Sequence, residues 1–321
     1  MQTIDKISEE LAQLRGELSK VFVGQDEVVT QLLVTLLANG HALMTGVPGL
    51  GKTQLVKSLS QLLGLSFRRI QFTPDLMPAD ILGGEVLEQD PETGRRNFRF
   101  QEGPLFTQVL LADEINRTPP KTQSALLEAM GERQVTTAGQ TRVLPEPFLV
   151  LATQNPIELE GTYPLPEAQL DRFLLNVVMD YLPIAEEVKM VSMTTRPVGV
   201  PLSAQLDAGR ILEMQALCRE VVAPEGVVEH AVSLCAATRP GTPQCLPRFQ
   251  QYVKWGAGSR ASQSLVLAGK ARALLAGRGN VSHEDINALV LPVLRHRVIV
   301  NFQAQAENVT VEQLLDELVG R

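Results

Sequence analysis

The spacing of apolar residues divides the chain into two parts that meet near residue 183. Before that point, short apolar runs alternate with segments in which apolar residues recur at helical spacing. The runs are typical of buried strands in a parallel sheet, and the spaced segments predict amphipathic helices. After residue 183 only the helical spacing remains. We therefore predict an α/β domain over residues 1–182 and an all-α domain over residues 183–321.

The first part contains the segments that we expect to form one sheet, with helices between them. The predicted strands are residues 41–44, 66–72, 109–114, 148–152 and 173–178. The predicted helices are residues 4–18, 26–38, 55–63, 119–130 and 166–171. Two further segments, 83–106 and 134–144, have the alternation and the central turn residues of hairpins, and the first should turn at residues 90–94.

The second part is predicted to contain helices joined by short loops. These helices are roughly residues 184–194, 204–220, 224–237, 259–276, 282–296 and 310–319. Ser282 followed three residues later by Asp285 is a signature of a helix start, because each side chain can bond a backbone N–H near the other.

Composition indicates an acidic globular protein with room for two cores. The chain has 321 residues, 44% of them apolar, and carries 29 Lys and Arg against 36 Asp and Glu, a net charge of −7. An acidic chain offers no overall attraction to nucleic acid or to anionic lipid. No apolar run approaches the ~18 residues of a membrane span, and the first residues do not form a signal-peptide core.

Cysteine and histidine usage favours a cytoplasmic protein without a disulfide framework or a zinc site. The 3 cysteines show no C-x-x-C spacing, which argues against a disulfide framework and against a zinc site. The 4 histidines lack metal-ligand spacing as well, so we expect structural roles for His41, His230, His283 and His296.

Residues 46–53 fit the phosphate-binding pattern G-x-x-x-x-G-K-[ST] at each fixed position, between a predicted strand and a predicted helix. Glycines let backbone N–H groups approach phosphate oxygens, and the helix that follows offers its N-terminus to the anion. Lys52 should contact the β- and γ-phosphates, and the Thr53 hydroxyl should bind Mg²⁺. The expected cofactors are ATP and Mg²⁺. The expected nucleotide contacts are Gly46, Val47, Pro48, Gly49, Leu50, Gly51, Lys52, Thr53 and Gln54. Val23 and Gly24 are candidate contacts to the adenine, and the same residues equally fit a plain strand or turn before the helix at 26–38.

Two carboxylates follow the apolar run at 109–112 and provide the second half of an ATPase site. We assign Asp113 to Mg²⁺ and Glu114 to the base or orienting group for the attacking water. Asn155 follows another predicted strand and should emerge beside them, where its amide can bond the γ-phosphate or the water. Taken alone, Asp-Glu after a strand and Asn-Pro after another are ordinary loop signals.

Several ordered motifs resemble those of the MoxR family of AAA+ ATPases. They are QFTPDL at 71–76, DEINR at 113–117, PPKTQ at 119–123, ATQNPIE at 152–158, LPEAQLDRF at 165–173 and LRHR at 294–297. The resemblance extends from about residue 20 to about residue 300. It is specific, because these motifs are long and independent of the phosphate-binding loop.

The resemblance implies an AAA+ core with strand order 5-1-4-3-2, a C-terminal helical lid and a ring, usually a hexamer. Segment 83–106 would be the helix-2 insert and 134–144 the pre-sensor-1 hairpin. Asn155 would be sensor 1, Arg172 the arginine finger that reaches the neighbouring subunit, and Arg260 sensor 2. Without the family, Arg172 has the pattern of a surface arginine and Arg260 that of a residue at a helix start. This chain has Gly258 and Ser259 where Ser-Pro is usual in the family.

The function that fits best is a ring ATPase that remodels, matures or activates partner proteins, as relatives do, often with von Willebrand factor A domain partners. The client is not named by the sequence. The alternative is a nucleic-acid-dependent AAA+ motor, for which Arg68, Arg69, Arg95, Arg96 and Arg99 supply local positive charge. A small-molecule kinase fits less well, because the carboxylate pair suits hydrolysis. A GTPase is disfavoured because no N-K-x-D motif is present.

Overall fold

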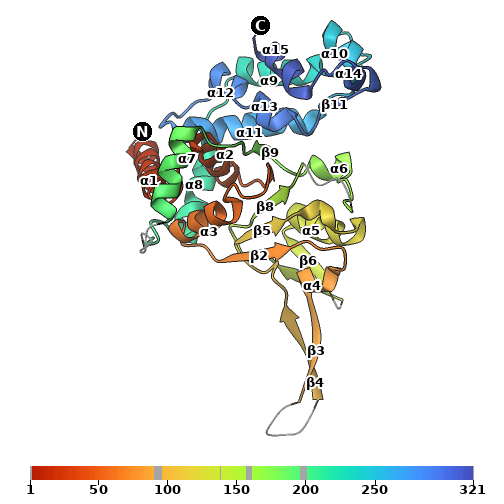
Figure 1. Ribbon diagram of the computed structural model, residues 1–321. Coiled ribbons are helices and arrows are strands. Elements are labelled where there is room, and N and C mark those ends of the chain that lie inside the picture. Colours follow the sequence, from red (N-terminus) through yellow and green to blue (C-terminus); the bar gives the residue numbers. More distant parts are fainter. Residues whose placement is uncertain (1, 90–95, 138, 157–160, 196–200, 321) are drawn as a thin grey trace.

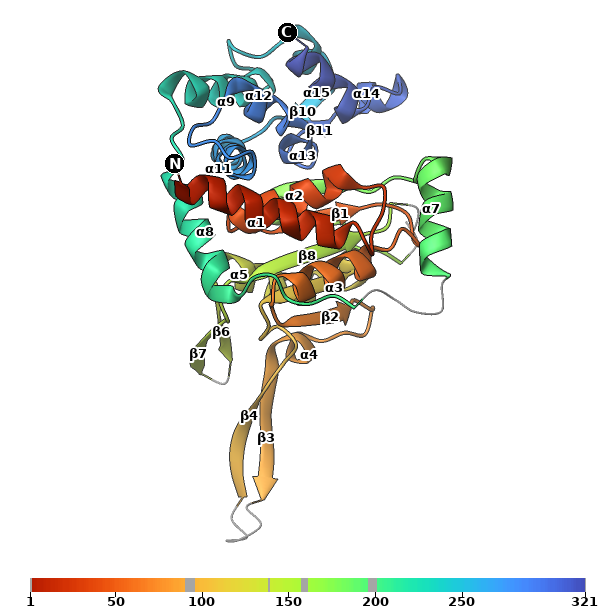
Figure 2. The ribbon, with the colours of Figure 1, turned by 90° about the vertical axis from the view of Figure 1, so that its left-hand side faces the viewer.

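The structure, a computed structural model, describes residues 2–89, 96–137, 139–156, 161–195 and 201–320. A parallel sheet lies in the middle of the molecule, a long hairpin extends from one end, and a group of helices covers the other (Figures 1 and 2). Among the described residues, no helix combines the length and the apolar character that crossing a bilayer requires.

The central sheet has five strands in the order β2-β5-β8-β1-β9, and all neighbours are parallel. Its strands are β1 (Ala42–Thr45), β2 (Phe67–Gln71), β5 (Val109–Asp113), β8 (Leu149–Gln154) and β9 (Leu175–Val178). When these strands are numbered along the chain, the order is 5-1-4-3-2, so the predicted topology is confirmed. The register pairs Gln71 with Asp113, which brings the ends of β2 and β5 together.

Helices cover both faces of the sheet. They are α1 (Gln2–Leu18), α2 (Asp26–Leu37), α3 (Lys52–Leu62), α4 (Pro78–Leu82), α5 (Pro120–Glu132), α6 (Glu167–Leu170) and α7 (Ile184–Thr194), with a 3₁₀ turn, η1 (Ile115–Arg117). Leu111 and Leu151 pack with α1, α2 and α3 on one face, whereas Leu110 and Val150 pack with α4 and α5 on the other. Because successive strand residues point to opposite faces, strands covered on both sides must be apolar throughout.

Two hairpins leave the core where the sequence predicts them. They are β3 (Gly83–Gln89) with β4 (Arg96–Glu102), and β6 (Gln134–Thr137) with β7 (Gln140–Val143). The β3–β4 hairpin points away from the C-terminal helices (Figure 1). Its base is tight, since Gly83 has φ +88° and an added Cβ would collide with the Gln101 carbonyl oxygen. The predicted turn at 90–94 lies outside the described residues, as do Arg95, Ala138, Ile157 and Glu158.

The C-terminal part is helical, with one short antiparallel pair of strands. Its elements are α8 (Ala208–Glu220), α9 (Glu225–Ala237), α10 (Pro247–Tyr252), β10 (Val253–Trp255), α11 (Ser259–Leu275), α12 (His283–Asn287), α13 (Val290–Leu294), β11 (Ile299–Val300), α14 (Phe302–Ala306) and α15 (Val311–Val319). The single helix predicted over 282–296 is two helices. Pro292 has no N–H to donate to the carbonyl of residue 288, so it is accommodated only in the first turn of a new helix.

The C-terminal helices share an apolar layer with the N-terminal part. Leu265 and Leu274 of α11 belong to the same buried cluster as residues of α1, α2 and α3. On α8, Gln215 donates to the Leu36 carbonyl oxygen of α2 at 2.7 Å, and Arg210 pairs with Glu10 of α1 at 2.9 Å. The division at 182/183 stays a prediction, since buried packing is continuous across it.

Candidate nucleotide site

The loop at residues 46–51 joins β1 to α3 in a conformation that requires glycine. Gly46 is buried, and an added Cβ would lie 2.5 Å from the Met179 carbonyl oxygen. Gly49 and Gly51 have φ angles of +87° and +77°, which are strained for any residue with a side chain. The loop therefore presents its backbone at the N-terminus of α3, where unpaired N–H groups and the helix dipole favour an anion.

Lys52 is the first residue of α3, directly after the loop, and its ammonium group is influenced by the charges of Asp113 and Glu114 at the end of β5. Its ammonium donates to the Gly46 carbonyl oxygen. Burial lowers the pKa of Lys52 from its ordinary value, while the charges of Asp113 and Glu114 act in the opposite direction. The lysine and both carboxylates are therefore close enough for their charges to affect one another. A Mg-nucleotide site needs a lysine and carboxylates grouped in this way.

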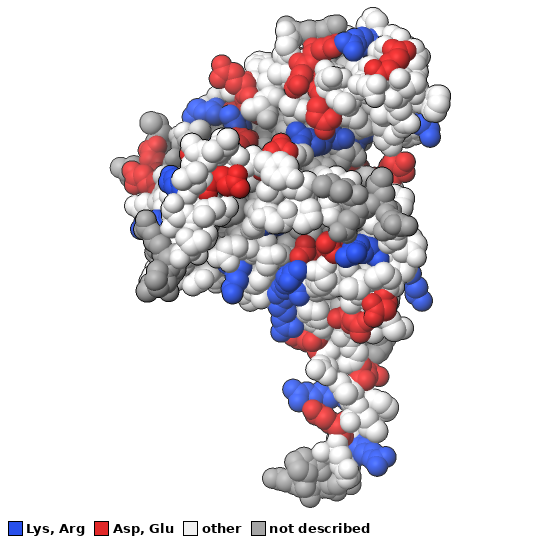
Figure 3. All heavy atoms as spheres, viewed as in Figure 1, with Lys and Arg blue, Asp and Glu red and all other residues white. Residues whose placement is uncertain are grey.

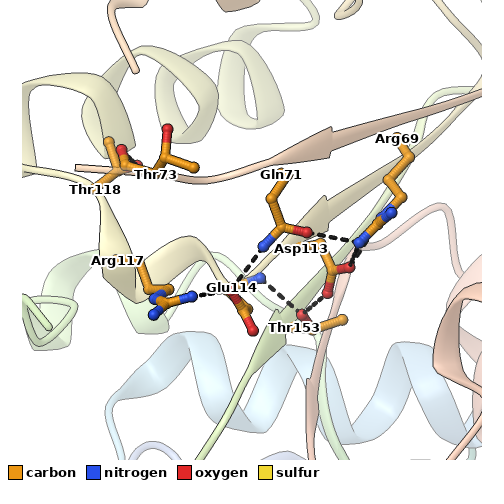
Figure 4. A network of polar contacts seen from close by, with 8 residues as sticks. All are labelled: Arg69, Gln71, Thr73, Asp113, Glu114, Arg117, Thr118 and Thr153. Carbon is orange, nitrogen blue, oxygen red and sulfur yellow. Dashed lines mark hydrogen bonds and ion pairs between the residues drawn. The ribbon is translucent and has the colours of Figure 1, made fainter. Parts of the chain in front are cut away.

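Asp113 ends β5 and is bonded by side chains from two neighbouring strands (Figure 4). Its Oδ1 accepts from the Thr153 hydroxyl at 2.5 Å. Its Oδ2 accepts from Nε and Nη2 of Arg69 at 2.9 and 2.6 Å. Asp113 is thus an oriented carboxylate at the carboxyl end of the sheet, where open α/β sheets bind their ligands.

Glu114 stands at a sharp turn between β5 and η1, with φ +57°. Its backbone N–H donates to the Thr153 hydroxyl at 2.8 Å. Its Oε2 accepts from Gln71 Nε2 at 2.7 Å and from Arg117 Nη1 at 2.9 Å. A non-glycine residue in the left-handed region is uncommon, and such positions gather at functional sites.

Asn155 follows β8 directly and is 7% exposed, at the same end of the sheet as Asp113 and Glu114. The structure therefore brings Lys52, Asp113, Glu114 and Asn155 to one end of the parallel strands, as the sequence predicts. Thr153 was not predicted as a site residue. Threonine is common in strands, so only the three-dimensional structure distinguishes its bridging hydroxyl from an ordinary strand residue.

A cavity of about 300 Å³ lies beside the phosphate-binding loop. It is lined by Val21, Phe22, Val23, Gln25, Pro48, Gly49, Leu50, Gly51, Gln54, Tyr181, Leu182, Glu187, Met190 and Thr194. Val23 and Gln54, two of the predicted nucleotide contacts, both line this cavity. Gly24 has φ +80°, and a Cβ added to it would lie 2.8 Å from the side chain of Leu182, which also lines the cavity. The aromatic and α7 residues of the lining were missed, because they become neighbours of the loop only through folding.

Arg172 lies at the opposite end of the strands from the phosphate-binding loop. β9 runs parallel to β1 with Leu175 beside Ala42 and Val178 beside Thr45. The loop follows the carboxyl end of β1, whereas Arg172 precedes the amino end of β9. The side chain is exposed and lies against the end of α5, where a Cβ added to Gly131 would overlap its guanidinium.

Arg260 lies near Arg172. It is in the first turn of α11, its side chain is 57% exposed, and its Nη1 is 3.6 Å from Asp171 Oδ2. The described lining of the cavity beside the phosphate loop includes neither arginine. Both predicted arginines thus lie beside Asp171, Arg172 as its neighbour in the chain and Arg260 as its ion-pair partner, and neither lines the described cavity beside the phosphate loop.

The chain is similar in sequence to known proteins along most of its length. Residues 41–175 match the model of the ATPase family associated with various cellular activities (AAA), and residues 247–318 match the AAA lid domain. Chaperone MoxR1 of Mycobacterium tuberculosis is 41% identical over 304 residues, which are 94% of this chain and 79% of that protein. The chain belongs to the MoxR family of AAA+ ATPases. Protein MoxR of Methylorubrum extorquens is 32% identical over 305 residues, 90% of this chain and 87% of that protein.

A solved structure supports the fold of this MoxR-family chain. The crystal structure of a proposed ATPase from Cytophaga hutchinsonii superimposes with a TM-score of 0.91 at 37% identity, covering 99% of this chain and 96% of that one. The fold is thus shared along nearly the whole length of both chains.

Proposed function

We propose that this MoxR-family protein is a magnesium-dependent ATPase that assembles into a ring and couples ATP hydrolysis to the remodelling, maturation or activation of partner proteins. The observation that carries the proposal is the position of Lys52, after β1, and of Asp113 and Glu114, at the end of β5, at the same end of the parallel sheet. Membership of an ATPase family supports the general activity. The metal, the individual residue roles and the ring are proposals.

The residues present fit a Mg-nucleotide. Thr53 and Asp113 offer a hydroxyl and a carboxylate, the oxygen ligands that Mg²⁺ takes, and Mg²⁺ in nucleotide sites needs few ligands from the protein. When bound, Mg²⁺ neutralises charge on the β- and γ-phosphates.

The other side chains have roles that follow from their positions. The loop backbone and Lys52 bind the phosphates, and the cavity lined by Val23 and Phe22 receives the base. Glu114 orients the attacking water and accepts its proton. Gln71 and Arg117 fix the orientation of the Glu114 carboxylate by donating hydrogen bonds to it. Asn155, nearly buried beside them, bonds the γ-phosphate or that water.

Arg172 and Arg260 act on the nucleotide of a neighbouring copy. Their position at the far end of the strands argues against contact with the phosphates of their own chain. A head-to-tail contact between identical copies brings opposite faces together, and closing it produces a ring. An arginine added to the transferred phosphoryl group accelerates hydrolysis by about 10³–10⁵-fold, so assembly would control turnover.

The proposed clients are proteins, with von Willebrand factor A domain proteins as candidate partners. The name of the mycobacterial relative, a chaperone, supports a protein client. A nucleic-acid motor is less well supported, because three of the five arginines that favour it make contacts within the chain. Arg69 pairs with Asp113, Arg99 pairs with Glu88, and Arg68 donates to the Gly103 carbonyl oxygen. On the face in Figure 3, acidic and basic side chains are interspersed along the core and hairpin.

Substitution of Glu114 tests the proposed chemistry. Glu114→Gln keeps the shape of the side chain but removes the base, so steady-state ATP turnover should fall by at least about 100-fold. Binding of a fluorescent ATP analogue should remain, because the phosphate loop and Asp113 are unchanged. Phosphate release and equilibrium binding are the two measurements.

The matched control is Glu128→Gln on the exposed side of α5, which should turn over ATP at the wild-type rate. Unchanged turnover in Glu114→Gln would show that the catalytic assignment is wrong. Loss of nucleotide binding together with turnover would mean that Glu114 serves the architecture of the site.

A further inference from the structure

Arg69 forms an ion pair with Asp113, the carboxylate that we propose as a ligand of the metal. It lies on β2, the edge strand next to β5, two residues before Gln71, whose register partner is Asp113. The guanidinium reaches along the sheet and places both Nε and Nη2 on the single oxygen Oδ2 of Asp113, at 2.9 and 2.6 Å. Its Nη2 also donates to Gln71 Oε1 at 2.6 Å, as Figure 4 shows.

Both oxygens of Asp113 are therefore engaged by the chain itself. The Thr153 hydroxyl holds Oδ1, and that hydroxyl also accepts from the backbone of Glu114, so this bond is part of the turn. Arg69 holds Oδ2 through a side chain that is 45% exposed. One contact is built into the fold, and the other comes from an exposed side chain that can turn into solvent.

We propose that Arg69 is a displaceable latch on Asp113, which occupies Oδ2 until a Mg-nucleotide arrives. A guanidinium and a divalent cation cannot share one carboxylate oxygen without strong repulsion, so Arg69 must leave before Oδ2 can accept the ion or its bound water. Ion pairs of this exposure are weak, so the latch opens under the attraction of a Mg-nucleotide. Arg69 is a positioning residue, and the inference rests on the proposed role of Asp113 in binding the metal.

The test is the magnesium dependence of nucleotide binding rather than turnover. A fluorescent ADP analogue is titrated onto the full-length protein over a range of Mg²⁺ concentrations, with a chelator-treated sample as the metal-free point. Arg69→Gln removes the competing cation, so the Mg²⁺ concentration at half-maximal binding should fall by about two- to fivefold. Arg69→Lys keeps the positive charge but lacks the two N–H donors that bond Asp113. Its Mg²⁺ concentration at half-maximal binding should lie between those of the wild type and Arg69→Gln.

Arg68→Gln is the matched control, because Arg68 is the neighbour on β2 and donates to the Gly103 carbonyl oxygen instead of to Asp113. Its Mg²⁺ midpoint should equal that of the wild type. Thermal unfolding of each variant checks the fold, and Arg69→Lys still tests the latch where Arg69→Gln does not fold.

The outcomes separate the latch from the function on which it rests. A midpoint in Arg69→Gln that is unchanged or raised overturns the latch. Weaker binding of Arg69→Gln in the metal-free sample also overturns it, because Arg69 would then be a nucleotide ligand. Wild-type binding that ignores Mg²⁺ altogether overturns the metal assignment of Asp113 itself, and the latch falls with it.

Discussion

Among single residues, Arg297 shows how one buried charge can join two parts of a chain. It is 7% exposed and donates to Asp171 Oδ1 at 2.7 Å, to the Phe173 carbonyl oxygen at 2.8 Å and to Ser264 Oγ at 3.1 Å. Burial lowers the pKa of Arg297 from its ordinary value, and the bond to Asp171 works against that shift. Residues 171–173 include Arg172, the proposed finger. Arg297 therefore connects the backbone around Arg172 to the C-terminal helices.

Loss of Arg297 should therefore cost far more stability than loss of Arg260, although both pair with Asp171. Arg297→Met leaves a half-buried carboxylate and several carbonyls without their donor, and should lower the free energy of unfolding by about 3–5 kcal/mol. Arg260→Ala removes an exposed contact at 3.6 Å and should cost at most about 1 kcal/mol. Urea unfolding of both variants measures the difference, and equal costs would contradict it.

Among elements, His41 connects three that are distant in sequence. It precedes β1, its Nδ1 accepts from the Val150 N–H of β8 at 3.0 Å, and its Nε2 donates to the Met130 carbonyl oxygen of α5 at 3.2 Å. Both ring nitrogens are used by the neutral form, so protonation would break the bond to Val150. Burial, together with the charge of Arg133, lowers the pKa of His41 to about 3, and the bond to Met130 acts in the opposite direction.

This shift predicts a specific loss of stability in acid. The unfolded chain takes up a proton on His41 near pH 6.5, whereas the folded chain does so only near pH 3. The free energy of unfolding should therefore fall as pH drops from 6.5 toward 3, by about 1.4 kcal/mol per pH unit from this residue. The free energy of unfolding, measured with urea at several pH values between 6 and 4.5, should fall less steeply with decreasing pH in His41→Gln than in the wild type, by about that amount. Parallel curves for the two proteins would exclude the assignment.

At the scale of the whole molecule, the proposed site residues are divided between the two ends of the central strands. The phosphate-binding loop and the pair Arg172–Arg260 lie at opposite ends of the β1 and β9 strands. A single copy thus has its phosphate-binding loop at one end of these strands and Arg172 at the other. These ends suit a repeating head-to-tail contact, in which each complete site needs two copies.

Mixing two inactive variants tests this sharing of sites. Arg172→Ala lacks the finger and Lys52→Ala lacks the phosphate contact, so each protein alone should be nearly inactive. In a 1:1 mixture about a quarter of the contacts should combine an intact loop with an intact finger, and turnover should recover accordingly. Mixing Lys52→Ala with Glu114→Gln is the control, because both changes lie in the same half-site and no contact is complete. Absence of recovery at any ratio would rule out the shared site.

The sequence by itself determined the features that depend on local chemistry. The glycines at positive φ, the apolar strands covered on both faces, the hairpins and the start of α12 at Ser282 all follow from neighbouring residues. The short helices α10 and α14 escaped prediction, because a helix of 6 or 5 residues shows too little periodicity to be recognised.

Only the tertiary structure decided which side chains meet. The contact of Arg69 with Asp113 depends on β2 pairing with β5, and the hub at Arg297 depends on the lid docking beside β9. The separation of Arg172 from its own phosphate loop depends on the parallel register of β1 and β9. These relations join residues far apart in the chain. Strand order and packing set them, and no local pattern of residues carries that information.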